Sequence, residues 1–126
     1  MAASVTRAEE NIGVIKKITW QWTSHTDGAV ATDTDGAATA RAYNGEIVRM
    51  VTVPGAGADA PDDNYDVAVY DEDGVDVLLG AGANRDTADT EQVAASSLSV
   101  VANDKLTLSV TGAGSGNKGT VHLYIR

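Results

Sequence analysis

The densest group of carboxylates in the sequence lies in residues 71–76, where four acidic side chains surround Gly74. Oxygen ligands spaced in this way resemble the start of a calcium-binding loop. A complete helical calcium loop also needs a bidentate Glu at its twelfth position, which is Gly82 here. Because Asp-Gly is a strong signal for a tight turn, we predict a turn with solvated acids and keep a structural calcium ion as the alternative. Residues 33–36 repeat the pattern on a smaller scale.

Residues 112–120 combine several glycines with Lys118 and a following Thr, as phosphate-binding loops do. Such a loop requires Gly directly before the Lys and Ser or Thr directly after it, and a helix must follow. Asn117 and Gly119 occupy those two positions, and a strand pattern follows. We therefore predict a flexible hairpin loop that binds no nucleotide.

The chain has two histidines, His25 and His122, which lie in unrelated segments. His25 is close in sequence to Ser24 and Asp27, but the members of a nucleophilic triad must converge from separate elements beside an oxyanion site. No acid lies at obvious zinc-ligand spacing from either ring. We therefore predict no catalytic, cofactor-binding or metal-ligating residue, and we predict that the protein is not an enzyme.

Trp20 and Trp22 point the same way from one predicted strand in a chain that contains no Phe. Large aromatic side chains dominate the interiors of small β proteins. The same pair, if exposed, would make a stacking platform for sugar rings or a contact patch for a partner protein. We predict that both rings belong to the core, because Thr19 and Gln21 already supply a polar opposite face.

Alternation of apolar and polar residues dominates the chain after residue 13, and the alternating segments are rich in Val, Ile, Thr, Tyr and Trp. The clearest strands are residues 18–23, 47–53, 65–70, 106–110 and 121–125, and shorter ones are expected near 29–31, 37–43, 75–79 and 98–101. Asp-Gly or Asn-Gly pairs at 27–28, 35–36, 44–45 and 73–74 predict tight turns. The pattern predicts an all-β fold: an antiparallel two-sheet sandwich or jelly roll of about eight strands.

The N-terminal residues 1–12 differ from the rest of the chain. Good helix formers follow Thr6, and Glu9 lies three residues beyond it, as in a capping box. A helix this short is marginal by itself. We therefore expect a short N-terminal arm, either folded onto a neighbouring subunit or frayed, followed by a single β-sandwich domain over residues 13–126.

The chain has 126 residues with 18 acidic and 9 basic side chains, which gives a net charge of −9. Phosphate neutralisation needs clustered Lys and Arg, so the composition argues against a nucleic-acid partner. The absence of Cys excludes disulfides, thiolate zinc sites and thiol catalysis. No apolar run is long enough to cross a bilayer and no secretory signal opens the chain, so we expect a soluble protein made in a cytoplasm and no membrane partner.

Residues 61–78 and 80–86, together with the closing strand at 119–126, resemble small structural proteins of tailed bacteriophages. The resemblance covers about the second half of the chain, and residues 1–40 have no part in it. It implies an all-β protein encoded among virion genes, and it carries no catalytic residues.

The resemblance implies a virion structural protein, most specifically a capsid decoration or cement protein made and assembled in the host cytoplasm. Its partners would be the major capsid protein or other virion proteins. We expect a homo-oligomer, with a trimer preferred because capsid lattices offer threefold sites. The alternative is a carbohydrate- or partner-binding β-sandwich module of a phage tail or fibre, in which Trp20, Trp22 or a Tyr stacks on a sugar and the loop at Asp71 holds calcium.

Overall fold

The computed structural model describes residues 2–93, 97–98 and 100–126. These residues form seven strands and one turn of 3-10 helix: β1 (Ser4–Ile12), β2 (Ile15–Thr23), β3 (Ile47–Pro54), η1 (Gly57–Asp59), β4 (Asp66–Tyr70), β5 (Glu91–Val93), β6 (Thr107–Thr111) and β7 (Lys118–Ile125). The all-β class and the five clearest strands expected from the sequence are confirmed.

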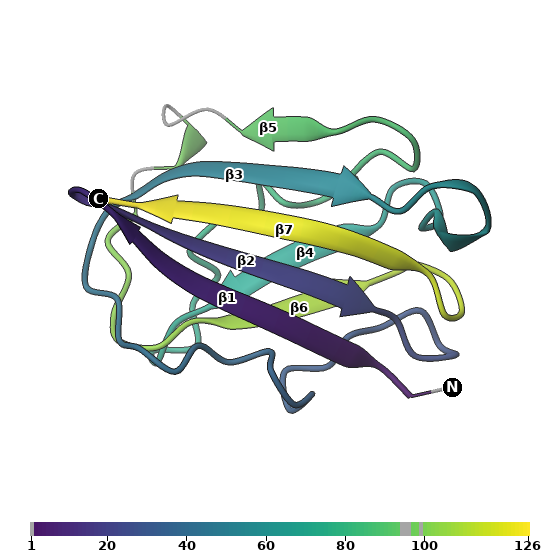
Figure 1. Ribbon diagram of the computed structural model, residues 1–126, viewed down its shortest axis with the longest axis horizontal. Helices are drawn as coiled ribbons and strands as arrows, with labels where there is room; N and C mark the ends of the chain where they lie inside the picture. Colours follow the sequence, from purple (N-terminus) through teal and green to yellow (C-terminus); the bar gives the residue numbers. More distant parts are fainter. Residues whose placement is uncertain (1, 94–96, 99) are drawn as a thin grey trace.

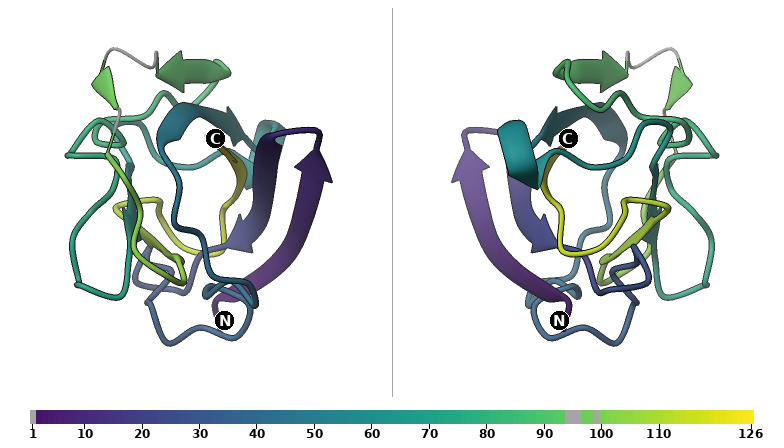
Figure 2. Two further views of the ribbon diagram at one scale, coloured as in Figure 1. Left: turned by 90° about the vertical axis from the view of Figure 1, so that its left-hand side faces the viewer. Right: turned by 90° about the vertical axis from the view of Figure 1, so that its right-hand side faces the viewer.

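The strands form two antiparallel sheets, one of five strands in the order β1-β2-β7-β3-β5 and one formed by β4 and β6. The smaller sheet lies behind the larger one, and the views from the two ends show the curvature of the larger sheet (Figures 1 and 2). The last strand of the chain is the middle strand of the larger sheet, because β7 pairs with both β2 and β3.

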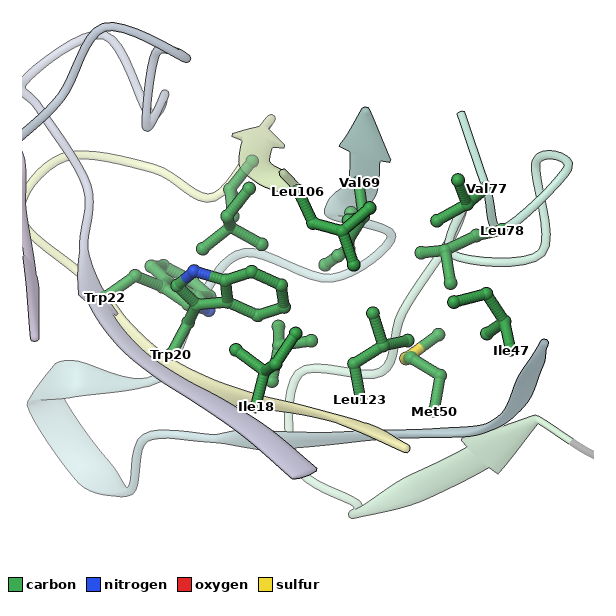
Figure 3. Packing of buried hydrophobic residues seen from close by; sticks show 14 of the residues in the cluster. Ile18, Trp20, Trp22, Ile47, Met50, Val69, Val77, Leu78, Leu106 and Leu123 are labelled. Atoms are coloured by element: carbon green, nitrogen blue, oxygen red, sulfur yellow. The ribbon is translucent and has the colours of Figure 1, made fainter. Parts of the chain in front are cut away.

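The core lies between the two sheets. On β2, Ile18, Trp20 and Trp22 point inward and are at most 1% exposed, so the prediction that both tryptophans are core residues is confirmed. Figure 3 shows Ile18 and Trp20 pointing toward Leu106 and Val69 on the opposite side of the core. Burying a large apolar side chain contributes roughly 1.5–3 kcal/mol, so alternation along the strands determines which face becomes the core.

The separate arm expected at the N-terminus is not formed, and no helix begins at the capping-box pattern of Thr6. Residues Ser4–Ile12 are strand β1, which pairs with β2 along its whole length and forms an edge of the larger sheet. The segment is therefore part of the sheet and not a separate arm. Nine paired residues satisfy far more backbone groups than one isolated helical turn, so strand pairing overrides the local helix propensity.

The shorter candidate strands form single bridges instead of strands. These bridges join Val30 to Val110, Ala38 to Thr107, Glu46 to Val101 and Tyr70 to Asp76. The candidate at 98–101 includes residue 99, which lies outside the described residues. Strand β5, which was not predicted, pairs Gln92 with Val51 at the other edge of the sheet. Three residues are too few for periodicity to reveal a strand.

Candidate functional site

Two of the four carboxylates in residues 71–76, those of Asp71 and Asp76, accept hydrogen bonds from backbone N–H groups. Asp71 accepts hydrogen bonds from Asp73 at 3.0 Å and from Asn103 at 3.2 Å, and Asp76 accepts them from three further backbone N–H groups. Gly74 has a φ of 75° and its N–H bonds to the Asp71 carbonyl. The predicted turn is confirmed. Within the described residues, no three His, Cys, Asp or Glu side chains are arranged to hold a metal ion.

Ser24 and His25 have separate structural roles. Ser24 is buried and accepts a hydrogen bond of 2.9 Å from the Asn117 backbone, while His25 is exposed beside Asp27, with 3.3 Å between Nδ1 and the carboxylate. The segment around Asn117 is not the hairpin expected from the sequence. It connects β6 of the smaller sheet to β7 of the larger one, so it crosses between sheets.

The outer face of the five-stranded sheet points away from β4 and β6. No described segment lies over it (Figure 1). Its outward positions alternate with the buried ones and are Ser4, Thr6, Ala8, Glu10, Ile12, Ile15, Lys17, Thr19, Gln21, Thr23, Arg49, Val51, Val53, Gln92, Lys118, Thr120, His122 and Tyr124.

Three of these residues form a row across the sheet, which we call the cationic row: Lys17, Tyr124 and Arg49. Lys17 on β2 and Arg49 on β3 are both direct register partners of Tyr124 on β7. The Lys17 Nζ lies 5.6 Å from the centroid of the Tyr124 ring, and the Arg49 Cζ lies 5.1 Å from it. Both cations are within the range of a cation–π contact, so the ring holds two positive charges at one place.

The next row toward the opposite end of the face contains Thr19, His122 and Val51. The Thr19 hydroxyl and the His122 Nδ1 are 2.9 Å apart. The pKa of His122 is lowered by burial first and then by the charges of Lys17 and Arg49. The ring is therefore neutral at neutral pH, and its environment has a positive potential.

A hollow of about 350 Å³ lies at the far end of the outer face. Gln21, Thr23, Val53, Lys118 and Thr120 are among the residues that line it. Its lining is a mixture of hydroxyl, amide and aliphatic groups with one cation. Among the described residues that line the hollow, Lys118 carries the one ionisable side chain, so this lining offers contact surface without an acid–base pair.

Charge is distributed unevenly over the molecule. The outward strand positions of the face carry Lys17, Arg49 and Lys118 but only one acid, Glu10. In the described part of the chain, neither Lys17 nor Arg49 forms an ion pair, whereas Arg7, Arg85 and Arg126 each have a carboxylate partner. A protein of net charge −9 therefore presents a face with uncompensated positive charge.

The structure assigns a role to Glu9 that sequence reasoning missed. Its carboxylate accepts hydrogen bonds from the backbone N–H groups of Ala40 and Arg41, from the Tyr43 hydroxyl and from Arg7 Nε. Glu9 is a register partner of Ile18 and therefore points to the inner side of the sheet. The signal in the sequence was an acid at an inward position of a strand. That strand was not predicted, because the local residues favour a helix.

Three buried polar atoms have no hydrogen-bond partner in the described residues: Trp22 Nε1, Thr52 Oγ1 and the Tyr65 hydroxyl. The Trp22 and Tyr65 rings are in contact, with centroids 5.6 Å apart and planes tilted by 54°. Burial raises the pKa of Tyr65, and the nearby Thr52 hydroxyl opposes the rise without the geometry of a hydrogen bond. The cluster belongs to the core and not to an open site.

Searches of protein-family models, of curated proteins and of solved structures find no match to this chain. In the described residues, no helix has both the length and the apolar character needed to span a membrane.

Proposed function

We propose that this protein is a structural protein of a bacteriophage virion, with the fold of a two-sheet sandwich or jelly roll. In the specific form of the proposal it decorates the capsid, binding as an oligomer to the major capsid protein or to other virion proteins. The observation that carries the proposal is the outer face of the five-stranded sheet, which is open and bears Lys17 and Arg49, two cations without a carboxylate partner among the described residues. The resemblance of residues 61–78, 80–86 and 119–126 to such proteins supports the same role.

The physical action proposed is stabilisation by binding alone. A stable protein–protein interface buries roughly 1,200–2,000 Å² in total, and the outer face extends across strands of eight and nine residues. A protein that binds the assembled shell and not its separated subunits stabilises the shell by mass action. A trimer fits this role because it matches the threefold positions of a capsid lattice.

The buried tryptophans bear on the carbohydrate-binding alternative. Trp20 and Trp22 are 0% and 1% exposed, so neither ring is available to stack on a sugar. The ring of Tyr124, which lies on the outer face, is in contact with Lys17 and Arg49. This arrangement favours a partner protein over a sugar as the occupant of the face.

The experiment that tests the proposed function uses purified particles of the virus that encodes the chain. Quantitative mass spectrometry should find the protein in a fixed ratio to the major capsid protein. Particles that lack it should release their genome at a lower temperature, and addition of the purified protein should restore the release temperature. Absence of the protein from washed particles would refute the proposal.

A further inference from the structure

We propose that the outer face of the five-stranded sheet binds a second copy of this chain in a head-to-tail contact. In this contact, the cationic row of one copy meets an acidic surface of the next. The inference rests on the proposed use of this face as an interface, and it adds the identity of the occupant and the symmetry of the contact.

The positive charge of the row is available to a partner. The described chain contains ion pairs for Arg7, Arg85 and Arg126 but none for Lys17 or Arg49. Arg49 is exposed and uses its Nε to bond Gln92 at 3.0 Å, which is a neutral partner. Glu10, the register partner of Lys17, is the single acid on the face and leaves a net positive charge there.

The complementary surface is present on the same chain. Of the 18 acids of the chain, all except Glu10 lie off the outward positions of the face. Many of them are exposed, such as Asp33 and Asp35 in the connection between β2 and β3 and Asp63 in the connection between η1 and β4. A second copy therefore offers exposed negative charge in connections that lie off its own cationic face.

The distribution of charge also determines the symmetry of the contact. A twofold contact through this face would bring two copies of the same net positive surface together, and with its axis at the cationic row it would oppose Lys17 and Arg49 to the same residues of the partner. Like charges at an interface are unfavourable. A head-to-tail contact avoids this repulsion and closes into a ring when the rotation between copies allows it. Tyr124 lies between the two cations, where a large aromatic side chain suits the centre of an interface.

The face is better suited to this contact than the edge of the sheet. At β1, the Arg7 guanidinium donates hydrogen bonds to the carbonyls of Gly36 and Ala38, and Glu9 accepts them from Ala40 and Arg41. The segment of residues 36–41 is thereby held against the edge strand. Inward charges and a covering segment are typical devices against edge-to-edge pairing.

The test measures the mass of the full-length protein by analytical ultracentrifugation over a concentration series. Wild type should self-associate at low salt, and the association should weaken at about 0.5 M salt, where the Debye length is only a few ångströms. Lys17→Glu should raise the dissociation constant by about tenfold or more. Lys105→Glu is the matched control, because it makes the same charge change at an exposed position off the face, and it should leave association within about twofold. Arg49→Lys keeps the positive charge, and this variant should retain the self-association of the wild type.

The outcomes separate this inference from the proposed function. A protein that stays monomeric at all concentrations, or whose association Lys17→Glu does not change, overturns the inference. If the protein is monomeric but Lys17→Glu removes it from virus particles, the face binds another virion protein, so the proposed function stands and the inference fails. If the copies associate through the face but the protein is absent from particles, the inference stands and the proposed function fails. Thermal unfolding of each variant verifies that it is folded.

Discussion

The Tyr43 hydroxyl donates a hydrogen bond of 2.8 Å to the carboxylate of Glu9, and this contact joins a loop to the edge strand β1. The two residues are 34 positions apart in the chain. Two backbone N–H groups of the same loop, from Ala40 and Arg41, bond to the same carboxylate. One acidic side chain therefore holds this loop against the edge strand of the larger sheet.

Replacing Glu9 should destabilise the protein substantially. Glu9→Ala leaves the Tyr43 hydroxyl and two backbone N–H groups without their acceptor, and hydrogen bonds to a charged group contribute roughly 1.5–3 kcal/mol each. We expect the free energy of unfolding to fall by about 2–4 kcal/mol, measured by urea denaturation. Glu10→Ala, at the neighbouring exposed position, is the control and should change it by about 0.5 kcal/mol or less.

The same carboxylate should make stability dependent on pH in the acid range. Burial by itself would raise the pKa of Glu9, but the hydrogen bonds that it accepts outweigh burial and lower the pKa below its ordinary value of 4.5. A lowered pKa in the folded state means a stabilising contribution that is complete above the unfolded pKa and is lost as pH falls through the folded one. Glu9→Gln should weaken the dependence of the free energy of unfolding on pH below about pH 4.5. If the slope is unchanged in this variant, the dependence comes from other acidic residues.

His122 should make the stability of the protein depend on pH in a second range, nearer to neutral pH. Its pKa is lowered from 6.5, chiefly by burial and then by the nearby cations. The unfolded chain then takes up a proton at higher pH than the folded protein does, so stability decreases as pH falls below about 6.5 and levels off below the folded pKa. His122→Gln should remove this part of the profile, whereas His25→Gln, on an exposed turn, serves as the control.

Loss of the hydroxyl group should affect the stability of the protein differently at two tyrosines, Tyr65 and Tyr43. The Tyr65 hydroxyl is buried without a hydrogen-bond partner among the described residues. Removing it in Tyr65→Phe should leave stability unchanged or raise it by up to about 1 kcal/mol. Tyr43→Phe loses the bond to Glu9 and should cost about 1.5–3 kcal/mol. Chemical denaturation of both variants measures the difference, and equal losses would contradict the assignment.

Two glycines with similar backbone angles should differ in their tolerance of a side chain. Gly36 has a φ of 88° and Gly74 a φ of 75°. A Cβ at Gly74 meets open space, whereas a Cβ at Gly36 would collide with the carbonyl oxygen of Val5 on β1. Gly74→Ala should cost about 1–2 kcal/mol from backbone strain alone, and Gly36→Ala should cost clearly more. Thermal unfolding compares the two.

Local sequence patterns were sufficient to predict which residues form much of the core. Alternation in residues 18–23 predicted which face of β2 is buried, because side chains of a strand point alternately to its two sides. The same argument placed Trp20 and Trp22 inside. The turn at residues 71–76 was predictable because Asp and Gly have strong local conformational preferences.

The sequence by itself determined the all-β class, most strands and the inward faces, since these depend on residues close together in the chain. Only the tertiary structure decided that β1 is a strand and that the smaller sheet has two strands. It also decided that Lys17, Arg49 and Tyr124 form one row. Strand order and register depend on pairing between distant segments, which one-dimensional periodicity does not contain.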